Sequence, residues 1–95
     1  MPVLMILEVP GGTIAQYEKT NEILGVMSDD TAPDGLISHA CGEVDGGILV
    51  VDLWQSEGAL NTFVTTRLRA ALTAAGMPEA HPRIVPTHNT IRGAA

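Results

Sequence analysis

The sequence predicts an α+β domain of the ferredoxin-like class, with its elements in the order βαββαβ. Two apolar runs rich in β-branched residues flank an Asp-Gly pair, a pattern typical of a β-hairpin. Another apolar run lies near each end of the chain, and a helical pattern separates each of these runs from the hairpin. We therefore expect a four-stranded antiparallel sheet with two helices on one face. The four expected strands cover residues 3–9, 36–43, 47–54 and 84–91.

The expected helices have recognisable ends. Thr13 and Gln16 fit a capping box, in which each side chain bonds to the backbone of the other residue, so a first helix should begin at about Ile14. Ser56 is suited to cap a second helix, because a serine hydroxyl can accept from a free backbone N–H in the first turn. Apolar residues then recur at helical spacing until Gly76, which is typical of a helix end.

The composition favours a single small domain, spanning residues 1–95, that pairs with a second copy of itself. A chain of 95 residues buries only about two-thirds of its unfolded surface. Hydrophobic residues make up 45% of the chain and charged residues only 17%, so we expect apolar surface to be covered in a homodimer. The net charge of −6, with five Lys and Arg in all, argues against nucleic acid and anionic membranes as partners.

The sequence also favours a cytoplasmic location. Cys41 is the only cysteine, so no intrachain disulfide is possible, as is usual in a reducing compartment. The N-terminal run has no basic segment and is interrupted by Glu8, unlike a signal peptide. No apolar stretch approaches the roughly 20 residues that a membrane span needs.

One histidine and one aspartate stand out inside the apolar runs of the hairpin. If Asp45 and Gly46 form a two-residue turn, His39 lies directly opposite Asp52 on the neighbouring strand. Cross-strand neighbours of this kind have Cβ atoms roughly 4.5–5.5 Å apart, which suits a hydrogen bond between imidazole and carboxylate. A shift of one residue in the register would separate the pair. The same register places Ile37 opposite Trp54 and Cys41 opposite Val50.

We expect the other face of the hairpin, with Leu49, Val51 and Leu53, to form the core beneath the helices. The face that carries His39 would then have no helix over it, and two copies would close their sheets into an α/β barrel around a cavity. Residues of the two outer strands would complete the cavity. Its expected lining is His39, Asp52, Trp54, His88, Glu8, Ile37, Cys41 and Val50.

The stretch VVDLWQSEGALNTFV, from Val50 to Val64, resembles the dimeric α/β barrel proteins of the antibiotic biosynthesis monooxygenase type. In both, the third strand ends in Trp and is followed by Ser and by a helix that opens with Ala-Leu and Phe. The resemblance implies that Trp54 lines a substrate cavity, as in cofactor-independent monooxygenases that act on quinols or anthrones. Haem-degrading relatives use Asn on the first strand and His on the second helix, and this chain has neither.

The pair of His39 and Asp52 has two interpretations. In one, the carboxylate orients a neutral imidazole that acts as a general base on a phenol or an activated carbon. The resemblance is consistent with this, because polyketide-cyclase-like and isomerase-like relatives use a His with a polar partner in the cavity. In the other, the two groups only satisfy each other beside an interface. Trp54 is likewise either a substrate platform or a core residue, and Cys41 a small apolar filler.

Two classes of function follow. The first is an enzyme that removes a proton from an aromatic or polyketide-like molecule, with or without dioxygen. The second is a non-catalytic dimeric domain that binds a small ligand or has a structural role. No flavin or nicotinamide fingerprint is present and no histidine spacing favours a metal site, so we expect no cofactor and no metal.

Overall fold

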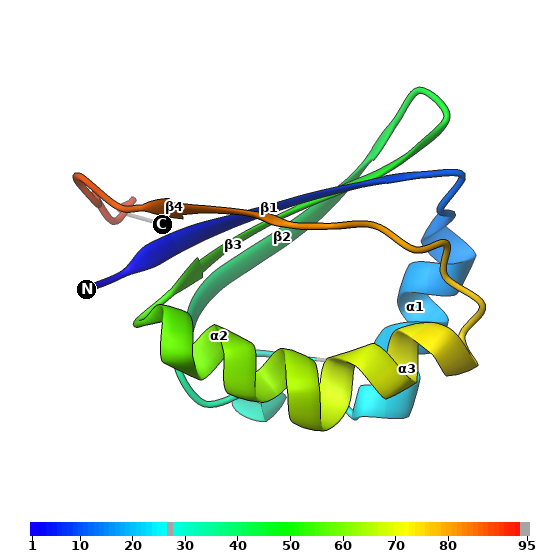
Figure 1. The fold of residues 1–95 in the computed structure, drawn as a ribbon, viewed down its shortest axis with the longest axis horizontal. Helices are drawn as coiled ribbons and strands as arrows, with labels where there is room; N and C mark the ends of the chain where they lie inside the picture. The colour runs from blue at the N-terminus through cyan, green and yellow to red at the C-terminus, as the bar shows by residue number, and fades with distance from the viewer. Residues whose placement is uncertain (27, 94–95) are drawn as a thin grey trace.

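The computed structural model describes residues 1–26 and 28–93. Its four strands form one antiparallel sheet in the order β2-β3-β1-β4, and the helices lie on one face of it (Figure 1). This confirms the predicted fold class. The elements are β1 (Val3–Pro10), α1 (Ile14–Leu24), the short η1 (Asp29–Thr31), β2 (Leu36–Val44), β3 (Gly47–Trp54), α2 (Glu57–Phe63), η2 (Val64–Leu68), α3 (Arg69–Ala74) and β4 (Arg83–Pro86).

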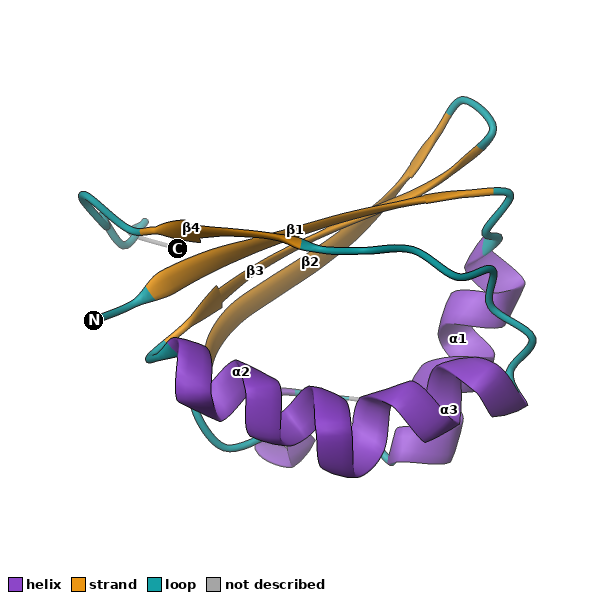
Figure 2. Cartoon of the chain, viewed as in Figure 1, coloured by secondary structure: helices purple, strands orange, loops and turns teal. Residues whose placement is uncertain are grey.

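The helix ends agree with the sequence patterns. Thr13 and Gln16 form the predicted capping box at the start of α1, with distances of 3.0 and 3.1 Å between the bonded atoms. The Ser56 hydroxyl accepts from the backbone N–H of Ala59 and begins α2. The predicted second helix is one helical run, visible as such in Figure 2, in which the π-helical η2 joins α2 to α3.

The last strand is shorter than predicted, since β4 ends at Pro86 rather than at residue 91. The reason is the length of its only neighbour. β4 pairs with β1, and the first residue of β1, Val3, lies opposite Pro86. Beyond that point no strand among the described residues pairs with it, and His88 lies outside the sheet and is exposed.

The predicted hairpin register is confirmed, with His39 opposite Asp52 and the turn at residues 45–46. Gly46 has a φ of 77° but Asp45 has no positive φ, so the turn is not the type I′ turn that Asp-Gly pairs favour. Ile37 is a second exception. It forms a bulge, because Leu36 pairs with Trp54 and Ser38 with Leu53, and the prediction that Ile37 lies opposite Trp54 is wrong.

The prediction of which sheet face lies under the helices is also wrong. The helices cover the face with Asp52, whereas Val51, expected in the core, is 40% exposed on the opposite face. The cause is the pairing of β1 with β3, which sets Met5 opposite Asp52. Residues opposite each other share a face, so the apolar set on β1 that contains Met5 shares a face with Asp52 and Trp54. The expected cavity face is thus covered within one chain, and a second copy is not needed to close it.

The opposite face of the sheet, here called the outer face, carries partly buried apolar residues on the two central strands. Ile6 lies opposite Val51, and Glu8 lies opposite Leu49. Among the described residues no helix packs on this face (Figure 1). Within residues 1–26 and 28–93, no helix has the length and apolar character to cross a membrane.

Candidate functional site

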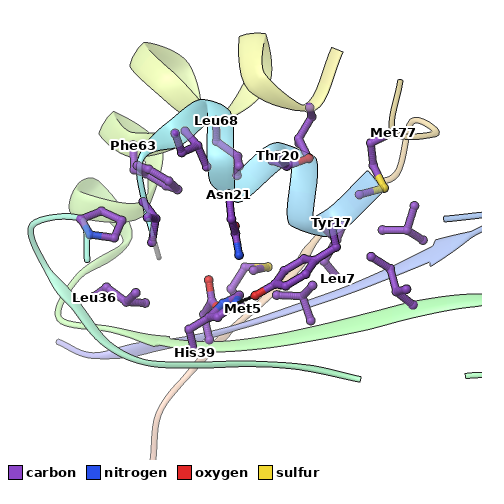
Figure 3. Close-up of a pocket in the computed structure, with 18 of the residues that line it drawn as sticks. Met5, Leu7, Tyr17, Thr20, Asn21, Leu36, His39, Phe63, Leu68 and Met77 are labelled. Carbon is purple, nitrogen blue, oxygen red and sulfur yellow. Dashed lines mark hydrogen bonds and ion pairs between the residues drawn. The ribbon is translucent and has the colours of Figure 1, made fainter. Parts of the chain in front are cut away.

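A cavity of about 100 Å³ lies between the sheet and the helices (Figure 3). An engineered apolar cavity of roughly 150 Å³ binds benzene, so this volume is on the scale of a single aromatic ring. The polar residues of its wall are Tyr17, Thr20, Asn21, His39 and Asp52, and its apolar residues include Met5, Leu7, Leu36, Val50, Trp54 and Phe63. Such a predominantly apolar wall with a few convergent polar groups is typical of a small-molecule site.

His39 and Asp52 form a hydrogen-bonded pair at the cavity wall. His39 Nδ1 lies 2.5 Å from Asp52 Oδ1, and the two residues face each other across β2 and β3. The Asp52 side chain is only 8% exposed, whereas that of His39 is 32% exposed because β2 is an edge strand. The imidazole therefore has contact with both the buried carboxylate and solvent.

The second carboxylate oxygen also has a partner. The indole Nε1–H of Trp54 donates to Asp52 Oδ2 at 3.0 Å. Trp54 is 1% exposed and stacks obliquely on Phe63, with ring centroids 5.5 Å apart. Burial of an unpaired carboxylate would be costly, and these two donors are what make the buried position of Asp52 tenable.

Tyr17 extends this arrangement from the helical layer. Its hydroxyl oxygen lies 2.5 Å from His39 Nε2, and the two rings are nearly parallel, with an interplanar angle of 7° (Figure 3). The capping box at Thr13 begins α1 at a point that places Tyr17 one turn into the helix, above β2. The site is therefore a continuous hydrogen-bonded series from Tyr17 through His39 and Asp52 to Trp54, here called the polar chain.

The proton positions in the polar chain follow from its ends. With Asp52 as a carboxylate that accepts from His39 Nδ1–H, a neutral imidazole presents Nε2 as an acceptor, and the Tyr17 hydroxyl is then the donor to it. Burial raises the pKa of Tyr17, a hydrogen bond from Asn21 lowers it, and the nearby Cys41 and Asp52 raise it further. The net effect is upward, so the Tyr17 phenol keeps its proton at neutral pH.

Some of the predicted cavity residues are in the wall and others are not. Val50 and Trp54 line the cavity together with His39 and Asp52. Cys41 lies opposite Val50 as predicted and packs against the core, but it is not part of the wall. Burial raises the pKa of the Cys41 thiol, which keeps it in the less reactive protonated form.

Three predicted residues lie away from the cavity. Glu8 is on the outer face, because it pairs with Leu49 rather than with a residue of the cavity side. Ile37 is displaced by the bulge and is 37% exposed, and Leu36 takes its place beside Trp54. His88 lies beyond the end of β4 and is exposed. Within residues 1–26 and 28–93, no three His, Cys, Asp or Glu side chains are grouped as metal ligands would be.

Sequence reasoning missed the contribution of the first helix. Tyr17 fits the first predicted helix only as one of its apolar residues, and Asn21 belongs to no recognisable motif, so neither is among the predicted site residues. The two residues are four apart and so share a helix face. Polar residues such as Thr20 and Asn21 beside Tyr17 and Leu24 on one helix face are the signal that would have indicated a site there.

Comparisons with known proteins agree with this arrangement at the level of the fold. No protein-family model matches the chain, and no curated protein matches it. Solved structures do match. Rv0793 from Mycobacterium tuberculosis has a TM-score of 0.72 and 14% identity over 97% of this chain and 100% of that one. A putative antibiotic biosynthesis monooxygenase from Deinococcus radiodurans has a TM-score of 0.60 and 16% identity over the full length of both chains.

SnoaB, a cofactor-independent oxygenase from Streptomyces nogalater, has a TM-score of 0.61 and 11% identity over 97% of each chain. This chain has the same fold. The predicted resemblance to antibiotic biosynthesis monooxygenase-type proteins is thereby confirmed for the architecture. At identities of 11–16% the likeness concerns the fold, and the chemistry has to be argued from the polar chain and the cavity.

Proposed function

We propose that this protein is a cofactor-independent enzyme that binds a small aromatic molecule in the cavity and removes a proton from it with His39 as the base. The observation that carries the proposal is the pair of His39 and Asp52 at the wall of an apolar cavity of single-ring size. Asp52 fixes the tautomer of the imidazole and stabilises the imidazolium that forms, which is the usual role of a carboxylate behind a catalytic histidine.

A phenol or quinol suits this site better than an aliphatic molecule. Its ring matches the apolar wall around Trp54 and Phe63, and its weakly acidic hydroxyl matches the basic imidazole of the polar chain. Deprotonation makes such a ring electron-rich and therefore reactive toward dioxygen. The substrate class that we propose is thus a single-ring phenol or benzenediol.

The reaction that we propose is a monooxygenation. A benzenediol and dioxygen would give a hydroxyquinone and water: one oxygen atom enters the ring, the other is reduced to water, and the ring supplies all four electrons. The fold shared with proteins described as monooxygenases or as a cofactor-independent oxygenase supports this assignment. One observation favours the alternative of a non-catalytic binding domain. The polar groups of the polar chain are already occupied by hydrogen bonds to one another, from Tyr17 through His39 and Asp52 to Trp54.

We further propose that the protein works as a homodimer through the outer face. Ile6 and Leu49 on this face are only partly buried, and Val51 is 40% exposed at its centre. A small chain with so apolar a face gains stability when a second copy covers it. In this arrangement each copy keeps its own cavity on the opposite side of the sheet.

Binding of single-ring phenols is expected to change the fluorescence of Trp54, the only tryptophan of the chain. Titrations with phenol, benzene-1,2-diol and benzene-1,4-diol should each saturate, because the ring contacts the indole or perturbs its bond to Asp52. Val50→Phe, which fills the cavity, should abolish the change, whereas Val51→Phe places the same ring on the outer face and should retain it. A flat response across the three compounds would contradict the proposed function.

A further inference from the structure

We propose that the hydroxyl of Tyr17 receives the proton of the ligand and passes its own proton to His39, so that Tyr17 is the residue the ligand touches. This inference rests on the proposed function and specifies the route of the proton. It follows from the way in which the nitrogens of His39 are occupied.

Neither imidazole nitrogen of His39 is available to a ligand in this structure. Asp52 Oδ1 lies 2.5 Å from Nδ1, and the Tyr17 hydroxyl oxygen lies 2.5 Å from Nε2. A direct proton transfer to Nε2 would first require Tyr17 to leave. Because Tyr17 sits in a capped helix and is half-buried in the cavity wall, that displacement would break packing as well as a hydrogen bond.

The Tyr17 oxygen is suited to the intermediate position. A phenolic hydroxyl that donates to Nε2 still has lone pairs with which to accept. Asn21, one turn further along α1, lowers the pKa of the Tyr17 phenol and has its amide directed into the cavity (Figure 3). A ligand hydroxyl in the cavity can therefore reach the Tyr17 oxygen while the contact between Tyr17 and His39 remains in place.

The proton step balances without an added reagent. The O–H bond of the ligand breaks and a new O–H bond forms on Tyr17, while the original Tyr17 proton moves to His39 Nε2. The ligand becomes an oxyanion and His39 an imidazolium, which Asp52 neutralises across the bond to Nδ1. Tyr17 is a neutral phenol before and after the step, in agreement with its raised pKa. His39, with 32% of its side chain exposed, can return the proton to water.

The test uses 4-nitrophenol, whose anion absorbs visible light and whose neutral form does not. Its ionisation in the complex is followed over pH by absorbance, and its binding by quenching of Trp54. In the wild-type protein the midpoint of ionisation should lie at least about one pH unit below that of the free probe, because a bound base takes up the proton. Tyr17→Phe keeps the ring but removes the oxygen that would accept the ligand proton, so the midpoint should return to that of the free probe.

Two further variants complete the comparison. His39→Gln should abolish the shift as well, since it removes the final acceptor. Thr73→Val removes a hydroxyl that donates to the Arg69 carbonyl in α3, away from the cavity, and should behave as the wild type does. A shift that is retained in Tyr17→Phe but lost in His39→Gln would overturn the relay and leave His39 as a direct base. Absence of binding or of any shift in the wild-type protein would overturn the proposed function together with the relay.

Discussion

Replacing His39 with alanine is expected to lower kcat/KM for the oxidation of a benzenediol by about 10²–10⁴-fold, the usual contribution of a general base. Asp52→Asn should cost less than His39→Ala, because it removes the charge that orients and stabilises the imidazole but keeps the base. Consumption of dioxygen, measured with benzene-1,4-diol over a range of concentrations, gives kcat and KM separately. The loss should fall mainly on kcat, since the base acts in the transition state.

Thermal unfolding of the same variants provides the control. The His39 side chain is partly exposed and Trp54 still donates to the buried Asp52 carboxylate, so His39→Ala should remain folded at the temperature of the assay. If instead the polar chain is only structural, both substitutions should lower Tm, and any activity should remain in proportion to the amount of folded protein. That pattern would support the non-catalytic alternative.

Two adjacent substitutions on β3 are expected to have opposite consequences. Val50→Asp places a carboxylate without a partner in the buried space under the helices, and it should prevent folding or destabilise the protein by several kcal/mol, as burial of an unpaired charge does. Val51→Asp places the same group on the outer face, where the residue is 40% exposed in the single chain. It should leave the fold intact and shift the protein from dimer to monomer.

Light scattering and circular dichroism distinguish these outcomes. The wild-type protein should have twice the mass of the chain at micromolar concentration, and Val51→Asp should have the mass of one chain with unchanged helical signal. A folded monomer already in the wild type would exclude the proposed homodimer. A well-folded Val50→Asp together with an unfolded Val51→Asp would contradict the assignment of the two faces.

The parts of the fold that depend on neighbouring residues could be predicted from the sequence. The capping box at Thr13 and the serine cap at Ser56 are local, and so is the Asp-Gly turn that sets His39 opposite Asp52. The turn fixes the register of β2 against β3, and with it the central pair of the candidate site. Trp54 follows because it is two residues from Asp52 on the same strand and therefore on the same face.

Which face of the sheet lies under the helices could not be predicted in the same way. It depends on how β1 pairs with β3, and the 36 residues between them contain no turn signal that sets this register. Both alternating sets on β3 are largely apolar, so hydrophobicity alone does not say which of Val50 and Val51 is inside. The bulge at Ile37 also interrupts the alternation of side chains between the two faces of β2, so that Leu36 lies on the cavity side of the sheet.

Tyr17 lay beyond prediction for a similar reason. Its contact with His39 joins residues 22 positions apart and depends on how α1 docks on the sheet. The pattern of α1 shows which face of the helix is apolar but not which strand residue that face meets. A long-range contact therefore makes Tyr17 part of the polar chain, and the sequence pattern does not show that contact.

The central claim is that a small aromatic molecule binds beside His39 between the sheet and the helices, and intermolecular nuclear Overhauser effects test it most directly. With protein labelled at its methyl groups and unlabelled benzene-1,4-diol, the ring protons of the ligand should show cross-peaks to Met5 and Leu36, whose side chains line the cavity. No cross-peak to Val51 is expected, because its side chain is on the outer face. Cross-peaks to Val51 without any to Met5 would contradict the account.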